Sequence, residues 1–460
     1  MKTRLRFCRG NLLRSAPALA ICILLFAVTA SAQIVEAVNC SNASQQQYSS
    51  INAALAAAVA TPGYTPGMQI YIGVSGPCTE AVKISGLQHV NLTGQDSPTV
   101  LNQPVVIPKD PSTGYPDYGP ALEIDGSSWV LVQNISFTGP GATSGGIAPL
   151  VLVQNSSAIT VGAAYGGPQV AIQNSVGDGL DVNASQFNIN GPATVQNNNE
   201  HGISIAGASN VTVGAWNSTQ PIAIQGNQDD GVAMGNGGIL SVYWYTTISG
   251  NGLNSGGTYA GLQMTGSTAL LCCGPGPNID HNTGWGIDAE ELSSVVIVGT
   301  GGAPASVSHN TQGGIYDVDG WVGIYNTTNI EYNGDSTQAN PLGGIEVLSN
   351  GALQAYGAIV ENNIGPGILV SQSSSADLGL GGTGPTTITG NTGSGIYVQV
   401  NGSVQFDGAG TTVTGNSPKD LTCAAAGIAA QDNGTPPTIG KMSCGNFFDL
   451  PPRKHKKAKN

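Results

Sequence analysis

Residues 389–398 read TGNTGSGIYV, and the spacing inside this stretch decides the fold. Asn391 lies four residues before Gly395, and an alternating apolar run follows the glycine directly. This marker glycine returns every 23 to 30 residues, at Gly179, Gly202, Gly231, Gly261, Gly286, Gly314, Gly344, Gly367 and Gly395. The asparagine returns with it as Asn198, Asn227, Asn282, Asn310 and Asn363. A recurrence of this length predicts a repeat architecture.

Each unit contains short runs with a period of two, such as ISI, VTV and IAI within residues 203–224. This alternation predicts strands with one buried face, and the intervening Gly, Asn and Ser permit tight corners. Three short strands cannot bury their own apolar face, so the units must stack, strand on equivalent strand. The predicted inward ladder contains Ile203/Ile205, Val232/Met234, Leu262/Met264, Ile345/Val347, Ile368/Val370 and Ile396/Val398.

These patterns predict an all-β fold, a single-stranded right-handed parallel β-helix with units about 4.8 Å apart. We expect the recurrent asparagines to stack at one corner, where their amides satisfy backbone groups. Leucine-rich repeats have a similar length but need a leucine framework, which is sparse here. The pattern resembles the β-helix repeats of secreted pectate lyase-like proteins over residues 69–416. The resemblance implies the fold, whereas one such fold carries many chemistries.

The beginning of the chain predicts export. Residues 1–32 read as a signal peptide, because a basic start and an apolar run precede the small residues Ala30-Ser-Ala32. We therefore expect a secreted, periplasmic or cell-envelope protein whose mature chain has no membrane span. A membrane anchor left uncleaved is the alternative.

The solenoid ends are predicted to be capped. Residues 33–68 predict an N-terminal cap with a short helix over residues 48–60, where alanine gives high helix propensity. Residues 417–450 predict a C-terminal cap, since the repeat stops after Asn416. Residues 451–460 predict a disordered basic tail.

Six cysteines remain after the signal, an even number that suits an oxidising compartment. Cys40 with Cys78, and Cys423 with Cys444, bracket the two ends and are predicted to form disulfides that staple them. The adjacent Cys272 and Cys273 leave three alternatives open: free thiols, a vicinal disulfide or metal ligands.

The charge distribution limits the partners. Between the signal and the tail, four basic residues stand against all 27 acidic ones, a formal charge of −23. Such a body repels phosphate backbones, so we expect no nucleic-acid partner. It also disfavours polyanionic pectin or alginate. We expect a monomer that binds a polysaccharide or a cell-surface glycan.

One acidic cluster emerges when the units are aligned on their marker glycines. The alignment gathers Asp178, Glu200, His201, Asp229 and Asp230 over three successive coils, with the aromatic residues Tyr259 and Trp285 above them. Carboxylates one coil apart fit a retaining glycosidase, and two coils apart an inverting one. The five polar residues are therefore candidate catalytic groups, and the two aromatics are candidate sugar-binding groups.

Two resemblances bear on this cluster. Asp229-Asp230 and His201-Gly202 resemble motifs of polygalacturonases, although their order is reversed and the later Arg-Ile-Lys element is absent. No arginine occurs between Arg14 and Arg453. This absence excludes the arginine-dependent chemistry of pectate lyases and pectin methylesterases.

The sequence alone favours a non-catalytic carbohydrate- or surface-binding protein, because exposed solenoid corners accept Asp, Glu and His without any catalytic role. The alternative is a glycoside hydrolase of polygalacturonase-like architecture. No cofactor is expected. Calcium is the one metal that clustered carboxylates would suit.

Overall fold

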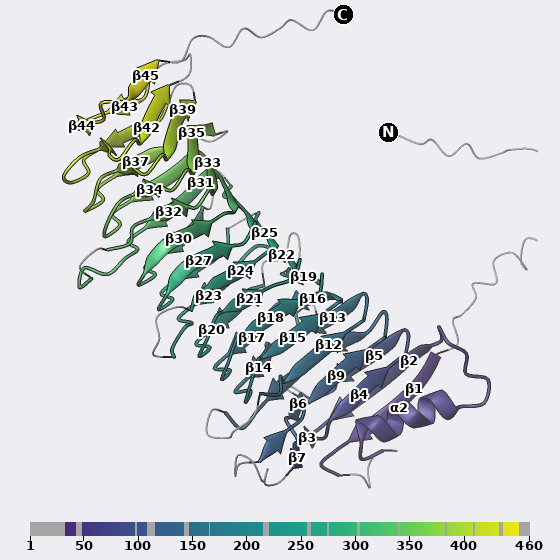
Figure 1. Ribbon diagram of the computed structural model, residues 1–460. Coiled ribbons are helices and arrows are strands. Elements are labelled where there is room, and N and C mark those ends of the chain that lie inside the picture. Colours follow the sequence, from purple (N-terminus) through teal and green to yellow (C-terminus); the bar gives the residue numbers. More distant parts are fainter. Residues whose placement is uncertain are drawn as a thin grey trace, which may run out of the picture.

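The computed structural model describes residues 33–42, 48–96, 99–107, 116–141, 147–164, 166–214, 220–254, 259–273, 276–300, 304–338, 341–381, 384–407, 410–431 and 436–449. These residues form a long stack of coils with a short helix across the N-terminal end (Figure 1). The predicted signal peptide and basic tail lie outside the described residues.

Each regular coil contributes three strands, one to sheet B and two to sheet A, and nearly all pairings are parallel. The fold is therefore a right-handed parallel β-helix, as the repeats predicted. Sheet B pairs in the order β4 (Val82–Ser85), β9 (Leu122–Asp125), β12 (Val151–Gln154), β15 (Leu180–Asn183), β18 (Ile203–Ala206), β21 (Val232–Met234), β24 (Leu262–Thr265), β27 (Trp285–Glu290), β30 (Gly313–Val318), β32 (Ile345–Leu348), β34 (Ile368–Val370), β38 (Ile396–Val398), β41 (Leu421–Cys423) and β44 (Met442–Ser443).

Sheet A consists of two parallel ladders, which we call A1 and A2. Ladder A1 contains β1 (Gln33–Asn39), β2 (Gln69–Ser75), β5 (Val90–Gly94), β10 (Leu131–Gln133), β13 (Ile159–Gly162), β16 (Gln186–Asn190), β19 (Asn210–Val213), β22 (Ile239–Val242), β25 (Thr268–Cys272), β28 (Ser294–Val298), β31 (Trp321–Glu331), β33 (Ala352–Glu361), β35 (Ser375–Gly381), β39 (Ser403–Asp407), β42 (Ile428–Gln431) and β45 (Phe447–Asp449). Ladder A2 contains β3 (Cys78–Thr79), β6 (Thr99–Asn102), β11 (Ile135–Thr138), β14 (Val170–Gln173), β17 (Ala193–Gln196), β20 (Ile222–Gln225), β23 (Thr246–Ser249), β26 (Asn278–Asp280), β29 (Ala305–Ser308), β37 (Thr387–Thr389), β40 (Thr412–Thr414) and β43 (Thr438–Ile439). Strands β31 and β33 run through both ladders.

Two small antiparallel pairings complete the strands. Strands β7 (Val105–Ile107) and β8 (Asp117–Tyr118) pair within an excursion from one coil, and β36 (Gly384–Pro385) pairs with the end of β35.

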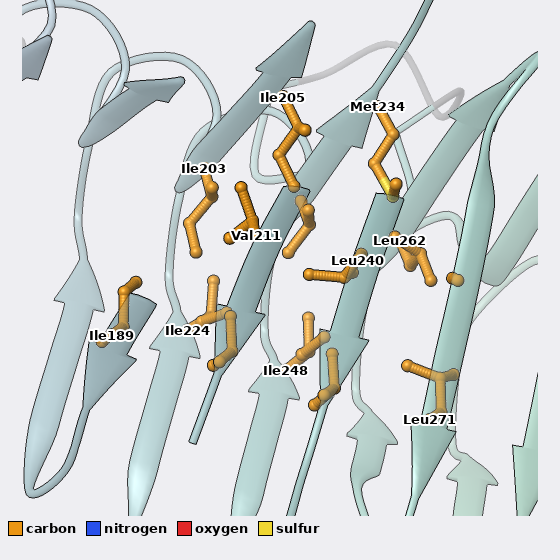
Figure 2. Packing of buried hydrophobic residues seen from close by; sticks show 14 of the residues in the cluster. Ile189, Ile203, Ile205, Val211, Ile224, Met234, Leu240, Ile248, Leu262 and Leu271 are labelled. Atoms are coloured by element: carbon orange, nitrogen blue, oxygen red, sulfur yellow. The ribbon is translucent and has the colours of Figure 1, made fainter. Parts of the chain in front are cut away.

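The interior is one continuous column of mostly apolar side chains. Every residue of the predicted inward ladder is at most 4% exposed, and register pairs each with its counterpart in the next coil. Figure 2 shows Ile203, Ile205, Met234 and Leu262 directed into the space between the sheets. Stacking therefore buries each face that a single coil would expose.

Asparagines stack at the corner between ladder A2 and sheet B, as predicted. The side-chain amide of Asn198 donates to Asn227 Oδ1 at 2.9 Å, and that of Asn282 to Asn310 Oδ1 at 2.9 Å. The same oxygens also accept the backbone N–H of the coil below. The complete ladder contains Asn198, Asn227, Asn251, Asn282, Asn310, Asn333, Asn363, Asn391 and Asn416.

A second polar ladder lies at the corner between sheet B and ladder A1. The backbone N–H of Ser127 donates to Ser156 Oγ at 3.0 Å, and that of Ser156 to Ser185 Oγ at 3.0 Å. Ser185 and Ser209, and higher up Ser267 and Ser293, continue the pattern. Buried hydroxyls thus satisfy backbone groups that the strands leave unpaired.

The N-terminal end is closed by α2 (Ile51–Ala60), whose first turn is capped by Ser50. Glu80 accepts the backbone N–H of Ile51 at 2.7 Å, so a carboxylate faces the positive end of the helix. The helix packs against the first coils through Ile51 and Leu55, which are buried. The predicted N-terminal segment also contributes β1, so coiling begins before residue 69.

The C-terminal prediction requires a similar correction. Residues 421–449 continue the stack, because β41 pairs with β38, β42 with β39 and β43 with β40. The coils therefore extend beyond Asn416, and the expected cap is built from the final coil. Repeats that lack the marker glycine still pair in register.

The six cysteines of the described residues form three disulfides. Cys40 bonds to Cys78 and Cys423 to Cys444, so each end is stapled as predicted. Cys272 bonds to Cys273, which selects the vicinal disulfide among the three alternatives. Within the described residues, no helix has the length and apolar character needed to span a membrane.

Candidate functional site

The predicted cluster lies at the corner where three successive coils enter sheet B. Strands β15, β18 and β21 pair in register there. Asp178, His201 and Asp230 precede these strands by the same two-residue step and occupy equivalent positions. Coils are about 4.8 Å apart, so Asp178 and Asp230 are separated by about 10 Å along the axis. The alignment on marker glycines placed these three residues correctly.

Each of these side chains accepts a hydrogen bond from the next coil. Asp178 Oδ1 accepts the backbone N–H of His201 at 3.0 Å, and His201 Nδ1 lies 3.2 Å from the backbone nitrogen of Asp230. Asp230 Oδ1 in turn accepts the N–H of Ala260. Three of the five predicted catalytic residues therefore stabilise backbone groups at this corner.

Asp230 is completely buried, and its second carboxyl oxygen lies 3.2 Å from His201 Nδ1. A group with no exposed surface cannot contact a substrate, so Asp230 is not positioned to act on one directly. Burial acts to lower the pKa of His201, but the adjacent carboxylate of Asp230 and the nearby charges of Asp178 and Asp229 outweigh it and raise the pKa.

Asp178 has the most displaced carboxyl in this cluster. Burial raises its pKa to about 7, the neighbouring His201 opposes that rise, and the negative field of Glu200 adds to it. Burial also raises the pKa of Glu200, with a further contribution from Asp229. A carboxyl that keeps its proton near neutral pH is a candidate general acid.

Asp229 has donors on its carboxylate. The Asn254 amide donates to Asp229 Oδ1 at 2.6 Å, and the Tyr259 hydroxyl is hydrogen-bonded to the same side chain. The charge of Asp229 is the largest cause of the raised pKa of Tyr259. Asp229 therefore accepts from both partners. Sequence reasoning identified Tyr259 but not Asn254, which lies in an insertion.

The position of Trp285 differs from the expectation. Its side chain is 5% exposed and its ring stacks on Tyr316, with centroids 5.0 Å apart. The neighbouring Gly313 has no Cβ, and any Cβ there would collide with the indole. The ring therefore does not form the sugar-stacking surface proposed for it, and Tyr259 is the aromatic residue that remains beside the carboxylates.

Two further buried carboxyls extend the acidic character along sheet B. Burial raises the pKa of Asp288 to about 7, with contributions from Glu290 and Asp230, and burial likewise raises the pKa of Glu346 to about 7. Sequence reasoning noted Asp288 only as a weak acidic spot and did not identify Glu346. Both follow a marker glycine by two residues, at the outward position of the strand. A search for acidic residues at that position would have identified them.

The cluster does not form a compact cation cage. Among the described residues, one group of three His, Cys, Asp or Glu residues brings its ligand atoms within 4.8 Å of one another, and it is Cys40, Cys78 and Glu80. Its two cysteines are joined in a disulfide, which removes them as thiolate ligands.

Comparisons with known proteins concern the fold alone. No family model matches the chain, and no curated protein matches it by sequence. Among solved structures, the A-module of the mannuronan C-5 epimerase AlgE4 from Azotobacter vinelandii is 12% identical, with a TM-score of 0.38 over 87% of this chain and 95% of that one. The Dettilon tailspike protein is 12% identical, with a TM-score of 0.45 over 85% of this chain and 68% of that one. Pectate lyase Pel9A is 14% identical, with a TM-score of 0.31 over 88% and 79%.

Proposed function

We propose that this protein hydrolyses a neutral polysaccharide at the corner where β15, β18 and β21 enter sheet B. Asp178 would act as the general acid and Asp229 as the general base. The observation that carries the proposal is the pair of contrasting carboxyl environments: burial raises the pKa of Asp178 to about 7, while Asp229 accepts hydrogen bonds from Asn254 and Tyr259. Titratable pairs with opposed environments are typical of acid–base catalysis.

The spacing favours inversion of configuration. Asp178 and Asp229 lie two coils apart, or about 10 Å along the axis. Carboxyl groups in inverting glycosidases are about 6.5–9.5 Å apart, which leaves room for the attacking water. In this arrangement Asp178 protonates the leaving oxygen and Asp229 takes a proton from water. Glu200, one coil from Asp178, would instead suit a retaining reaction, and the anomer first released distinguishes the two.

The remaining residues would support this pair. His201 lies between the two coils, and its interaction with buried Asp230 keeps the imidazole oriented. The expected substrate is neutral, because a body with a formal charge of −23 disfavours polyanions. Calcium is not assigned a role, and we expect activity to persist in the presence of a chelator.

A second candidate is non-catalytic glycan binding at the same corner. It is favoured by the hydrogen bonds through which Asp178, His201 and Asp230 serve the backbone of the next coil. Solenoid corners need such acceptors whether or not catalysis occurs.

One assay separates the candidates. The purified protein would be incubated with a panel of neutral polysaccharides, and new reducing ends would be measured together with retention on each polymer. We expect release by the wild type, with a loss of at least about 100-fold in Asp178→Asn and in Asp229→Asn. Asp319→Asn, which changes an exposed carboxyl far from the corner, should retain full activity.

The pH dependence gives a second readout. Because the proton on Asp178 is lost as the pH rises through about 7, kcat should fall above neutral pH. Retention on one polymer without any new reducing ends would instead support the binding candidate. Wild-type rates in both substituted variants would reject the assignment of Asp178 and Asp229.

A further inference from the structure

The outer face of ladder A1 has a hollow in coils that lie above the acidic corner. One outward column of this ladder reads Trp321, Ala352, Ser375, Ser403 and Ile428, in register across five strands. Bulky side chains stand at the two ends and three small ones lie between them. We call this hollow the notch.

The size of the notch suits a short oligosaccharide. Its cavity volume is about 360 Å³, within the range of small-molecule sites. Trp321 and Ile428 are four coil steps apart, or about 19 Å along the axis. The small side chains of Ala352, Ser375 and Ser403 form the floor of the notch and leave space between Trp321 and Ile428.

The neighbouring column supplies planar hydrogen-bonding groups. Gln354, Asp377 and Gln405 follow one another in register and line the same cavity. Amide and carboxylate groups at this spacing both donate to and accept from vicinal hydroxyls. Of the described residues that line the notch, none carries a positive charge, which disfavours an anionic ligand.

Two tyrosines hold these polar groups in place. The Tyr325 hydroxyl donates to Gln354 Oε1 at 2.5 Å, and the Tyr356 hydroxyl donates to Asp377 Oδ2 at 2.6 Å. Their rings contact each other edge to face, with centroids 6.2 Å apart. The binding groups are thus preorganised before any ligand arrives, which lowers the entropic cost of binding.

The orientation of Trp321 depends on a glycine. A Cβ at Gly323 would collide with the outer atoms of the Trp321 indole and with the ring of Tyr325. The absence of that side chain lets the indole lean across the strand toward Tyr325. The half-buried ring then forms one wall of the notch. An aromatic wall beside planar polar groups is an arrangement that recognises a sugar ring.

We propose that the notch is a binding site for a neutral oligosaccharide, with one sugar ring stacked on Trp321 and its hydroxyls bonded to Gln354, Asp377 and Gln405. The notch lies on β31, β33, β35, β39 and β42, whereas the proposed catalytic residues precede β15, β18 and β21. The two sites are on different sheets and in different coils. Binding at the notch therefore does not depend on the proposed hydrolysis.

The test is binding of reduced neutral oligosaccharides from glucan, mannan and xylan, measured by isothermal titration calorimetry with the full mature chain. We expect at least one series to bind, with a loss of tenfold or more in Trp321→Ala. Ser375→Phe, which fills the floor of the notch and leaves Trp321 in place, should cause a similar loss. Far-UV circular dichroism would show that both variants keep the wild-type fold.

Two controls set the limits of the result. Tyr332→Ala removes a half-exposed aromatic ring outside the notch and should bind as the wild type does. Asp178→Asn should also bind normally, because the notch is separate from the acidic corner. The proposal is overturned if no neutral series binds, if both notch variants bind like the wild type, or if oligogalacturonides bind as tightly as the neutral series.

Discussion

Asp317 provides the sharpest test of how the interior is built. It lies in the inward column of sheet B between Ala289 and Val347, and it is completely buried. Among the described residues, neither carboxyl oxygen has a hydrogen-bond partner of acceptable geometry. A carboxyl thus lies where the neighbouring coils place apolar side chains, and Asp317→Asn should reveal what its ionisation costs.

The surroundings explain how the side chain fits. Gly320 and Gly351 occupy positions of the corner ladder where lower coils have serine. A Cβ at either glycine would collide with a carboxyl oxygen of Asp317. The carboxyl therefore fills the space that two serine side chains would otherwise fill.

The magnitude follows from the pKa. Burial raises the pKa of Asp317 from 3.8 to about 7, although the backbone N–H groups of Ala352 and Gly320 oppose the rise. Three units correspond to about 4 kcal/mol at 1.36 kcal/mol per unit. Because the folded pKa lies above the unfolded value, the folded state retains a proton that the unfolded state loses. Stability is therefore present below about pH 4 and is lost progressively as the pH rises toward 7.

The assay is urea unfolding followed by far-UV circular dichroism between pH 4 and pH 8. Other buried carboxyls also titrate in this window, so the informative quantity is the difference between Asp317→Asn and the wild type. We expect that difference to shift in favour of the variant by about 4 kcal/mol from pH 4 to pH 8. The charge of the exposed Asp319 adds to the raised pKa of Asp317, so Asp319→Asn should move the difference in the same direction by a smaller amount. A constant difference for Asp317→Asn would refute the reasoning.

Two further predictions concern the ladders and the staples. Asn282→Ala removes the acceptor of a backbone N–H and of an amide in the coil below, and should lower the free energy of unfolding by about 3 kcal/mol; a loss below about 0.5 kcal/mol in urea unfolding would contradict a stabilising role for the ladder. Replacing Cys423 and Cys444 by serine opens a loop with a sequence separation of 21, and should cost about 3 kcal/mol. Replacing Cys272 and Cys273 opens no chain loop and should lower the free energy of unfolding by under about 0.5 kcal/mol. Equal losses for the two pairs would contradict the view that a disulfide stabilises by limiting the entropy of the unfolded chain.

The coil register was predictable because each marker glycine opens a strand of sheet B. Counting back from Gly202 and Gly231 brought His201 and Asp230 to equivalent corners, where the structure places them. Local spacing sufficed here because stacked coils repeat the same corner. The number of residues between one corner and the next did not matter.

The asparagine ladder could be predicted only in part, because the distance from the asparagine to the marker glycine varies. Asn251 lies ten residues before Gly261, and Asn333 lies eleven before Gly344, because insertions separate the corner from the strand. Both asparagines nevertheless stack with the rest. A search for asparagine four residues before the glycine could not identify them. Their stacking depends only on their position at the corner, whatever the distance to the marker glycine.

Contacts between side chains at different register positions were the hardest features to predict from the sequence. The sequence placed Trp285 above the acidic cluster, but its burial against Tyr316 depends on the missing side chain of Gly313 in the next coil. The notch likewise depends on columns that cross five strands, with Trp321 leaning over Gly323. The burial of Trp285 and the columns of the notch arise between side chains of different coils, which a pattern within one unit does not encode.

The most direct test of the proposed function is a titration of the Asp178 carboxyl, since it requires no knowledge of the substrate. Carbon-13 NMR of protein labelled at the aspartate carboxyl carbons, compared with Asp178→Asn, isolates this one resonance. We expect it to titrate near pH 7. A midpoint below pH 5 would show that Asp178 is ionised at neutral pH and cannot serve as the proton donor.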